Sequence, residues 1–143
     1  MDNSMGVPQI KRLLWLDDCR NPHDNEVDWL VFSPIGRDVE VHWVKSYREF
    51  TKWITDNGLP DGICFDHDLG KETERDLIAQ GYSKKEARKH KGEEKSGHDC
   101  AKWLIDYCID HNLNLPAYSS QSANPVGREN LLSILDQYKS VCQ

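Results

Sequence analysis

Two short apolar runs, each followed at once by aspartates, decide the fold class of this chain. Leu13-Leu14-Trp15-Leu16 leads into Asp17-Asp18, and Ile63-Cys64-Phe65 leads into Asp66-His67-Asp68. Apolar runs of this length that end in polar residues are typical of strands buried on both faces. Residues 39–44, which are rich in valine, and residues 117–120, which follow a Leu-Pro pair, complete a set of four predicted strands.

Helical segments separate these predicted strands. Ser46 and Glu49 have the spacing of a capping box at the start of one helix. One apolar stripe predicts a second helix over residues 98–111, and another predicts a last helix that starts near Pro125. Residues 19–38 are rich in Asn, Pro, Asp and Gly, which predicts a long loop. Strands separated by helices favour parallel βαβ units in a doubly wound α/β sheet of about four strands.

Residues 71–96 form a charged stretch between the third strand and the next helix. The pattern predicts two short helices, with breaks at Gly81 and Gly92. Because one domain commonly has about 150 residues, we expect a single domain over residues 1–143 with 71–96 as an insert. Charge runs usually form a solvated face. The alternative is a basic lid over an acidic pocket, which would help to hold an anionic substrate.

The overall charge narrows the classes of partner. The chain has 143 residues, 18 Lys and Arg against 24 Asp and Glu, and a formal net charge of −6. This charge argues against generic binding to duplex DNA or to anionic membranes. No run of about 18 apolar residues is present, so no membrane span is predicted. The first residues lack an apolar signal core, and the cytoplasm is the expected location.

The aspartates that follow the first and third strands are predicted to meet. In parallel sheets, ligands bind outside the carboxyl ends of the strands, where the strand order switches direction. We expect Asp17, Asp18 and Asp66 at this point, with Asp68 as a further ligand or a base. Carboxylates held together repel each other unless a cation neutralises them or they take up protons. Oxygen ligands favour Mg²⁺ or Mn²⁺ over zinc, so the sequence predicts a divalent-metal site.

Three groups beside these aspartates are candidates for binding a phosphate. Arg128 lies near the start of the last predicted helix, where free N–H groups and a guanidinium suit a phosphate; the alternative is a salt bridge to a neighbouring acid. Asn124 before Pro125 is typical of a helix N-cap, and Ser122 is expected either to cap the same helix or to bind phosphate.

These motifs resemble a known family. Asp17-Asp18, Asp66 followed by Leu69, Gly97 and Ser122-Ala123 are similar, in order, to the receiver domain of bacterial response regulators. A narrower resemblance, to the cyclic-phosphate-processing receiver family, rests on three motifs: Trp15-Leu16-Asp17-Asp18-x-Arg20-x-Pro22, Asp66-His67-Asp68-Leu69-Gly70, and Ser122-Ala123-Asn124-Pro125-Val126-Gly127-Arg128-Glu129-Asn130. The resemblance spans residues 15–130 and implies a receiver-like (flavodoxin-like) fold. It also implies a small phosphate-ester substrate, such as a cyclic phosphate or an RNA end.

Two departures from the resembled families bear on the chemistry. No fifth strand that would carry the receiver lysine is visible, and Gln121 stands where members of the narrower family often have histidine. A proton carrier would then be His67 or His98. Strand alternation predicts that His67 points away from Asp66 and Asp68, so a structural hydrogen bond is at least as well supported for its ring as proton transfer.

Three functions remain open from the sequence. The first is a metal-dependent phosphodiesterase or phosphohydrolase in which Asp66 is a metal ligand or a nucleophile. The second is a signalling receiver that accepts a phosphoryl group on Asp66. The third is a degenerate receiver that binds a protein partner without chemistry.

Overall fold

A four-stranded parallel sheet forms the centre of the computed structural model, which describes residues 10–69, 74–90 and 95–142. The strands are β1 (Lys11–Leu16), β2 (Val39–Val44), β3 (Gly62–Phe65) and β4 (Ala117–Ser120), in the order β2-β1-β3-β4. All three pairings are parallel. The predicted parallel α/β fold with four strands is therefore confirmed. The strand order switches direction between β1 and β3, and in parallel sheets the carboxyl ends of the strands at such a point are where ligands commonly bind.

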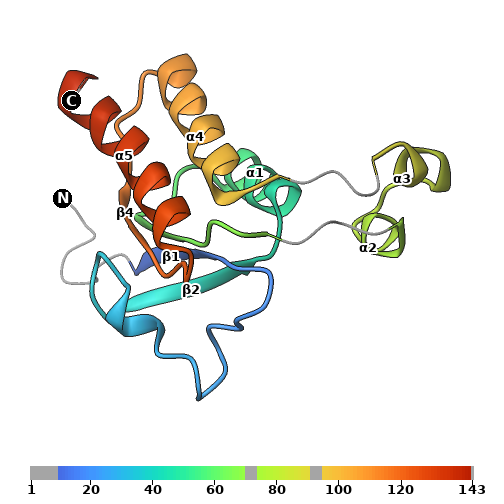
Figure 1. Ribbon diagram of the computed structural model, residues 1–143, viewed down its shortest axis with the longest axis horizontal. Coiled ribbons are helices and arrows are strands. Elements are labelled where there is room, and N and C mark those ends of the chain that lie inside the picture. The colour runs from blue at the N-terminus through green and yellow to red at the C-terminus, as the bar shows by residue number, and fades with distance from the viewer. Residues whose placement is uncertain (1–9, 70–73, 91–94, 143) are drawn as a thin grey trace, which may run out of the picture.

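Three long helices cover one face of the sheet, as Figure 1 shows. They are α1 (Tyr47–Asn57), α4 (Gly97–His111) and α5 (Pro125–Cys142). Their apolar stripes pack on the side chains of β1 and β3 that point to this face. The fully buried residues of this core are Leu14, Leu16, Phe50, Ile54, Ile63, Phe65, Cys100, Ala101, Leu104, Cys108, Leu131 and Leu135. Among the described residues, no helix has the length and apolarity that a membrane crossing requires.

The chain between β1 and β2 covers the opposite face (Figure 1). It contains one turn of 3₁₀ helix, Trp29–Val31, within the predicted loop 19–38. Its apolar side chains pack on Leu13, Trp15 and Cys64, which lie on this face of β1 and β3. The indole N–H of Trp15 donates to the backbone oxygen of Arg20 at 2.9 Å. The loop is therefore tied to the sheet immediately beside the predicted aspartates.

Local capping explains where the helices begin. Ser46 is the N-cap of α1, and its hydroxyl accepts from the Glu49 amide at 3.1 Å. The Glu49 carboxylate accepts from the Lys45 amide instead of closing the predicted capping box on Ser46. A complete capping box, Ser96 with Asp99, begins α4. These caps satisfy amides that the first turn of each helix leaves without an intrahelical partner.

The insert contains the two predicted short helices, α2 (Glu74–Ala79) and α3 (Lys84–His90). The turn between them passes through Gly81, whose φ of +100° favours glycine. Leu77 and Ala87 are fully buried, whereas the basic side chains of α3 are exposed. In Figure 1 the pair of helices lies beyond α1, at the side of the molecule away from α5. The predicted break at Gly92 falls outside the described residues.

Candidate functional site

Asp17, Asp18 and Asp66 meet at the carboxyl ends of β1 and β3. One carboxylate oxygen from each lies within 4.8 Å of the other two. The strand register causes this meeting: Leu16 pairs with Phe65, and the ladder continues as the Asp66 amide donates to the Leu16 oxygen at 2.9 Å. Asp17 and Asp66 are buried, and Asp18 is partly exposed. The structure thus brings together the three aspartates that we predicted to hold a metal.

The negative charges of these aspartates repel each other, and the pKa of Asp66 reflects this repulsion. Burial, followed by the negative charge of Asp17, raises the pKa of Asp66 from 3.8 to about 6, while Arg20 opposes the rise. A buried carboxylate with a carboxylate neighbour favours its neutral form, because neither water nor a counter-charge stabilises the anion fully. A cation placed among the three oxygens would remove this penalty.

Arg20 supplies part of the missing positive charge. Its Nε donates to Asp17 Oδ2 at 2.9 Å, and its Nη2 lies 3.9 Å from Asp66 Oδ1. The same Nη2 donates to the backbone oxygen of Gln121 at 2.7 Å. The other oxygen of Asp17 accepts from the amides of Cys19 and Arg20. The sequence analysis named Arg20 only within a family motif and did not predict it as a site residue. Its position three residues after Asp17, in a predicted loop, could have indicated an ion pair with that aspartate.

Gln121 follows β4 directly, as Asp17 follows β1 and Asp66 follows β3. These three positions form a row across the sheet. Phe65 pairs with Ser120, so Asp17, Asp66 and Gln121 occupy successive positions across β1, β3 and β4. The Gln121 side chain is buried, and its Nε2 donates to the Leu16 oxygen at 2.9 Å. Within the described part of the chain, its Oε1 has no hydrogen-bond partner. Buried acceptors normally have a partner, so this oxygen is able to accept one further hydrogen bond.

The donor set fits a hard divalent cation. Three carboxylates supply only oxygen ligands. Magnesium commonly takes one or two protein carboxylates and keeps sites for water and phosphate oxygens. The acidic cluster is therefore compatible with Mg²⁺ or Mn²⁺.

The comparison with family models agrees with this geometry. The model described as "Cyclic-phosphate processing Receiver domain" matches residues 12–137. The chain belongs to this family. Comparisons with curated proteins and with solved structures gave no match. The predicted family and the receiver-like fold are thus confirmed.

In this receiver domain, His67 and Asp68 form a pair next to the cluster. His67 Nδ1 lies 2.9 Å from Asp68 Oδ1, and the Asn124 amide lies 3.4 Å from the same oxygen. The hydrogen bond to His67 lowers the pKa of Asp68. The prediction that His67 points away from Asp68 was wrong, because β3 ends at Phe65 and strand alternation no longer applies.

Close backbone packing holds the His67 ring against α5. A Cβ added at Gly127 would lie 2.4 Å from the ring, so only glycine allows this approach. His67 and His98 line one cavity of about 370 Å³, together with Ser96, Asn130, Ser133 and Ile134. His67 and His98, which we predicted as alternative proton carriers, therefore line the same cavity.

Ser122, Asn124 and Arg128 surround the start of α5 in this receiver domain. The Asn124 side chain accepts from the Gly127 amide at 3.1 Å, which confirms its predicted N-cap role. Ser122 Oγ accepts from the Asn124 amide at 3.1 Å. Arg128 is exposed, and its Nε donates to the Ser120 oxygen at 3.2 Å. Arg20, rather than Arg128, is the arginine in contact with the aspartates.

Proposed function

We propose that this receiver domain hydrolyses cyclic phosphates or related phosphate esters with a divalent cation held by Asp17, Asp18 and Asp66. The observation that carries the proposal is the meeting of these three carboxylates at the β1–β3 switch point. The family match supports the same class of substrate. When bound, the cation would polarise the phosphate and lower the pKa of a coordinated water.

The proposed reaction is an ordinary ester hydrolysis. The water gives up a proton to a base as its oxygen forms a bond to phosphorus, one ester P–O bond breaks, and the departing alkoxide oxygen takes up a proton. A cyclic phosphodiester thereby becomes a phosphomonoester. We assign proton transfer to the Asp68–His67 pair: the carboxylate holds Nδ1 and leaves Nε2 to carry the proton. His98, across the same cavity, is the second candidate for this role.

The phosphate oxygens need donors as well as the cation. We assign them to Ser122, to Asn124 and to Arg128 at the start of α5, where free amides and the positive end of the helix dipole favour anions. Arg128 engages only one of its guanidinium nitrogens in the hydrogen bond to Ser120. The other two guanidinium nitrogens are able to donate two parallel hydrogen bonds to a phosphate.

Paired variants test these roles. Asp66→Asn should lose both metal binding and cleavage, whereas Arg128→Ala should keep metal binding and lower turnover by about 10²–10³, the usual effect of losing one preorganised donor. Arg128→Lys should recover activity only in part, because ammonium lacks the two-pronged geometry. Asp110→Asn, on the exposed side of α4, is the matched control. Metal binding is followed by thermal shift, and cleavage with cyclic nucleotides and RNA ending in 2′,3′-cyclic phosphate. Wild-type cleavage by Arg128→Ala would reject the assigned role of Arg128.

A phospho-accepting receiver is the second candidate function. The position of Asp66 after β3, next to the acidic pair after β1, favours it, because this order of motifs resembles the receiver domain of response regulators. Incubation with acetyl phosphate and Mg²⁺, followed by intact mass, separates the two. An acid-labile phosphate on Asp66, with no ester cleaved in the screen, would favour signalling and a protein partner.

A further inference from the structure

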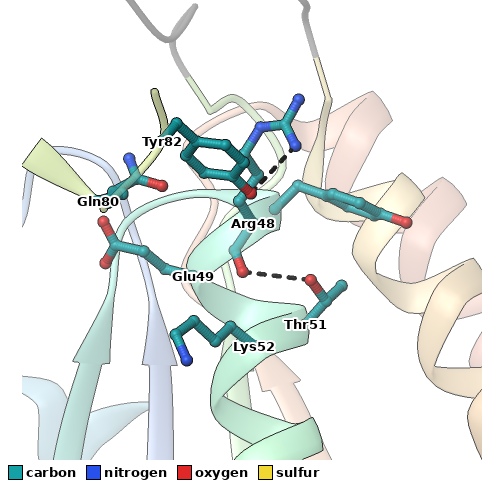
Figure 2. Close-up of a pocket in the computed structure, with 8 residues that line it drawn as sticks. Arg48, Glu49, Thr51, Lys52, Gln80 and Tyr82 are labelled. Atoms are coloured by element: carbon teal, nitrogen blue, oxygen red, sulfur yellow. Dashed lines mark hydrogen bonds between the residues drawn. The ribbon is translucent and has the colours of Figure 1, made fainter. Parts of the chain in front are cut away.

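A second cavity, of about 570 Å³, lies outside the acidic cluster. It opens between the first turns of α1 and the turn that joins α2 to α3. Figure 2 shows the side chains around it: Arg48, Glu49, Thr51 and Lys52 from α1, and Gln80 and Tyr82 from the insert. The volume falls within the range of small-molecule sites, about 300–1,000 Å³. Neither the metal site nor the proposed proton transfer uses any of these residues.

The sheet places this cavity and the acidic cluster at the same edge. β2 ends at Val44, and α1 begins three residues later at Tyr47. The oxygen of Val44 accepts from the Asp17 amide at 3.0 Å, so the end of β2 lies directly beside the first aspartate. An extended ligand that reaches the aspartates with one end therefore has the first turn of α1 on its path along this edge.

The chemistry of the lining suits a planar, polar ring. The Arg48 guanidinium lies 5.2 Å from the centre of the Tyr82 ring, and its Nη1 is 3.4 Å from the Tyr82 hydroxyl. In Figure 2, Gln80 and Glu49 lie on the other side of Tyr82 from this guanidinium. Aromatic rings and guanidinium planes are the surfaces on which single-stranded bases stack. Amide and carboxylate groups pair with the edges of bases.

The neighbouring helix has the charge that a nucleic-acid backbone needs. Helix α3 has the sequence Lys-Lys-Glu-Ala-Arg-Lys-His and exposes Lys84, Lys85, Arg88 and Lys89. The whole chain has a net charge of −6, so this basic helix is a local exception. Basic side chains beside a stacking site are the combination found in proteins that bind single strands. The overall charge still disfavours generic binding to duplexes.

We propose that the cavity between α1 and α2–α3 binds a base of single-stranded RNA, and that α3 contacts the neighbouring phosphates. The inference rests on the proposed function, since it names the substrate class as an RNA strand that ends in a cyclic phosphate. A free cyclic phosphate without a base would fill the acidic cluster but not this cavity.

Binding of a short fluorescein-labelled single-stranded RNA with a 3′-hydroxyl end, followed by anisotropy, tests the proposal in the full chain. Tyr82→Ala should weaken binding by about 5- to 160-fold, the usual loss for one stacked base. Tyr82→Phe keeps the ring and should stay within about twofold of wild type. Lys84→Glu with Lys85→Glu should reduce the salt dependence of binding, by about 0.7 in the log–log slope per phosphate contact. Lys102→Glu with Lys139→Glu, on the exposed sides of α4 and α5, is the charge-matched control.

The outcomes separate this proposal from the proposed function. If Tyr82→Ala binds RNA as wild type does while Asp66→Asn loses ester cleavage, the cavity proposal is wrong and the function stands. If Tyr82→Ala loses RNA binding but no ester is cleaved by the wild type, the cavity stands and the function fails. Equal affinity for duplex RNA of the same sequence would also overturn base stacking. Thermal unfolding of each variant establishes that the fold is intact.

Discussion

Replacing Asp66 by asparagine should stabilise the metal-free protein while abolishing its response to metal. Burial and the charge of Asp17 raise the pKa of Asp66 from 3.8 to about 6. One pKa unit corresponds to about 1.4 kcal/mol, so ionised Asp66 destabilises the native state at pH 7 by at most about 3 kcal/mol. Asparagine has nearly the same shape and no charge to desolvate. We expect the variant to gain about 1–3 kcal/mol in EDTA, which corresponds to about 3–8 °C in Tm.

The stability gained by Asp66→Asn should depend on pH. An acid whose pKa is raised by folding penalises the native state above that pKa, and the penalty disappears as the group becomes protonated in both states. The advantage of Asp66→Asn should therefore be full above pH 6 and fall to less than about 1 kcal/mol near pH 4. Thermal or urea unfolding in EDTA across this pH range measures it, with Asp110→Asn as the control.

Metal should reverse the order of stability. Ligand at 1,000 times its Kd stabilises a native state by about 4.1 kcal/mol, which exceeds the advantage of the variant, and only the wild type should gain this from Mg²⁺ or Mn²⁺. A variant that is less stable than wild type in EDTA at pH 7.5 would refute the reasoning. So would a stability difference that does not change with pH.

Three further changes test other parts of the site and the fold. Arg20→Ala removes the guanidinium from buried Asp17 and should destabilise the metal-free protein by about 1.5–3 kcal/mol. Because the guanidinium then no longer neutralises the aspartates in place of a metal, Mg²⁺ should raise Tm more than it does in wild type. An unchanged response to metal would contradict this role of Arg20. Gly97→Ala places a Cβ 1.8 Å from the backbone oxygen of Asp66 and should lower both stability, by about 1–3 kcal/mol, and metal affinity, as measured by unfolding and titration calorimetry; a neutral effect would contradict the close packing of α4. Ser46→Ala removes the cap of α1 and should lower the free energy of unfolding by about 1 kcal/mol without altering metal affinity, which urea denaturation checks.

Much of this architecture is encoded locally, and local signals were sufficient to predict it. The buried strands follow from short apolar runs that end in aspartates, and the start of α5 follows from Asn124 and its hydrogen bond to Gly127. The acidic cluster needed one further rule, that carboxyl ends of parallel strands share an edge. Because Asp17 and Asp66 directly follow their strands, no knowledge of the exact register was needed to place them together.

Other features depend on contacts that sequence neighbours do not determine. His67 contacts Asp68 because β3 ends at Phe65. Beyond the end of the strand, the alternation of side chains no longer predicts where His67 points. The cavity next to Tyr82 exists only because the insert returns to α1, more than thirty positions away in the chain, where Tyr82 and Arg48 are separated by 34 residues.

The sequence by itself determined which groups stand at the ends of the strands; the tertiary structure alone decided how their charges are balanced. Arg20 and Gln121 are 101 residues apart, yet a 2.7 Å hydrogen bond joins them beside Asp17 and Asp66. The loop that contains Arg20 is held there by the indole of Trp15, and Gln121 arrives through the pairing of β3 with β4. Electrostatic energy depends on distances between atoms and on burial, and both quantities are set when distant segments pack, not by their order along the chain.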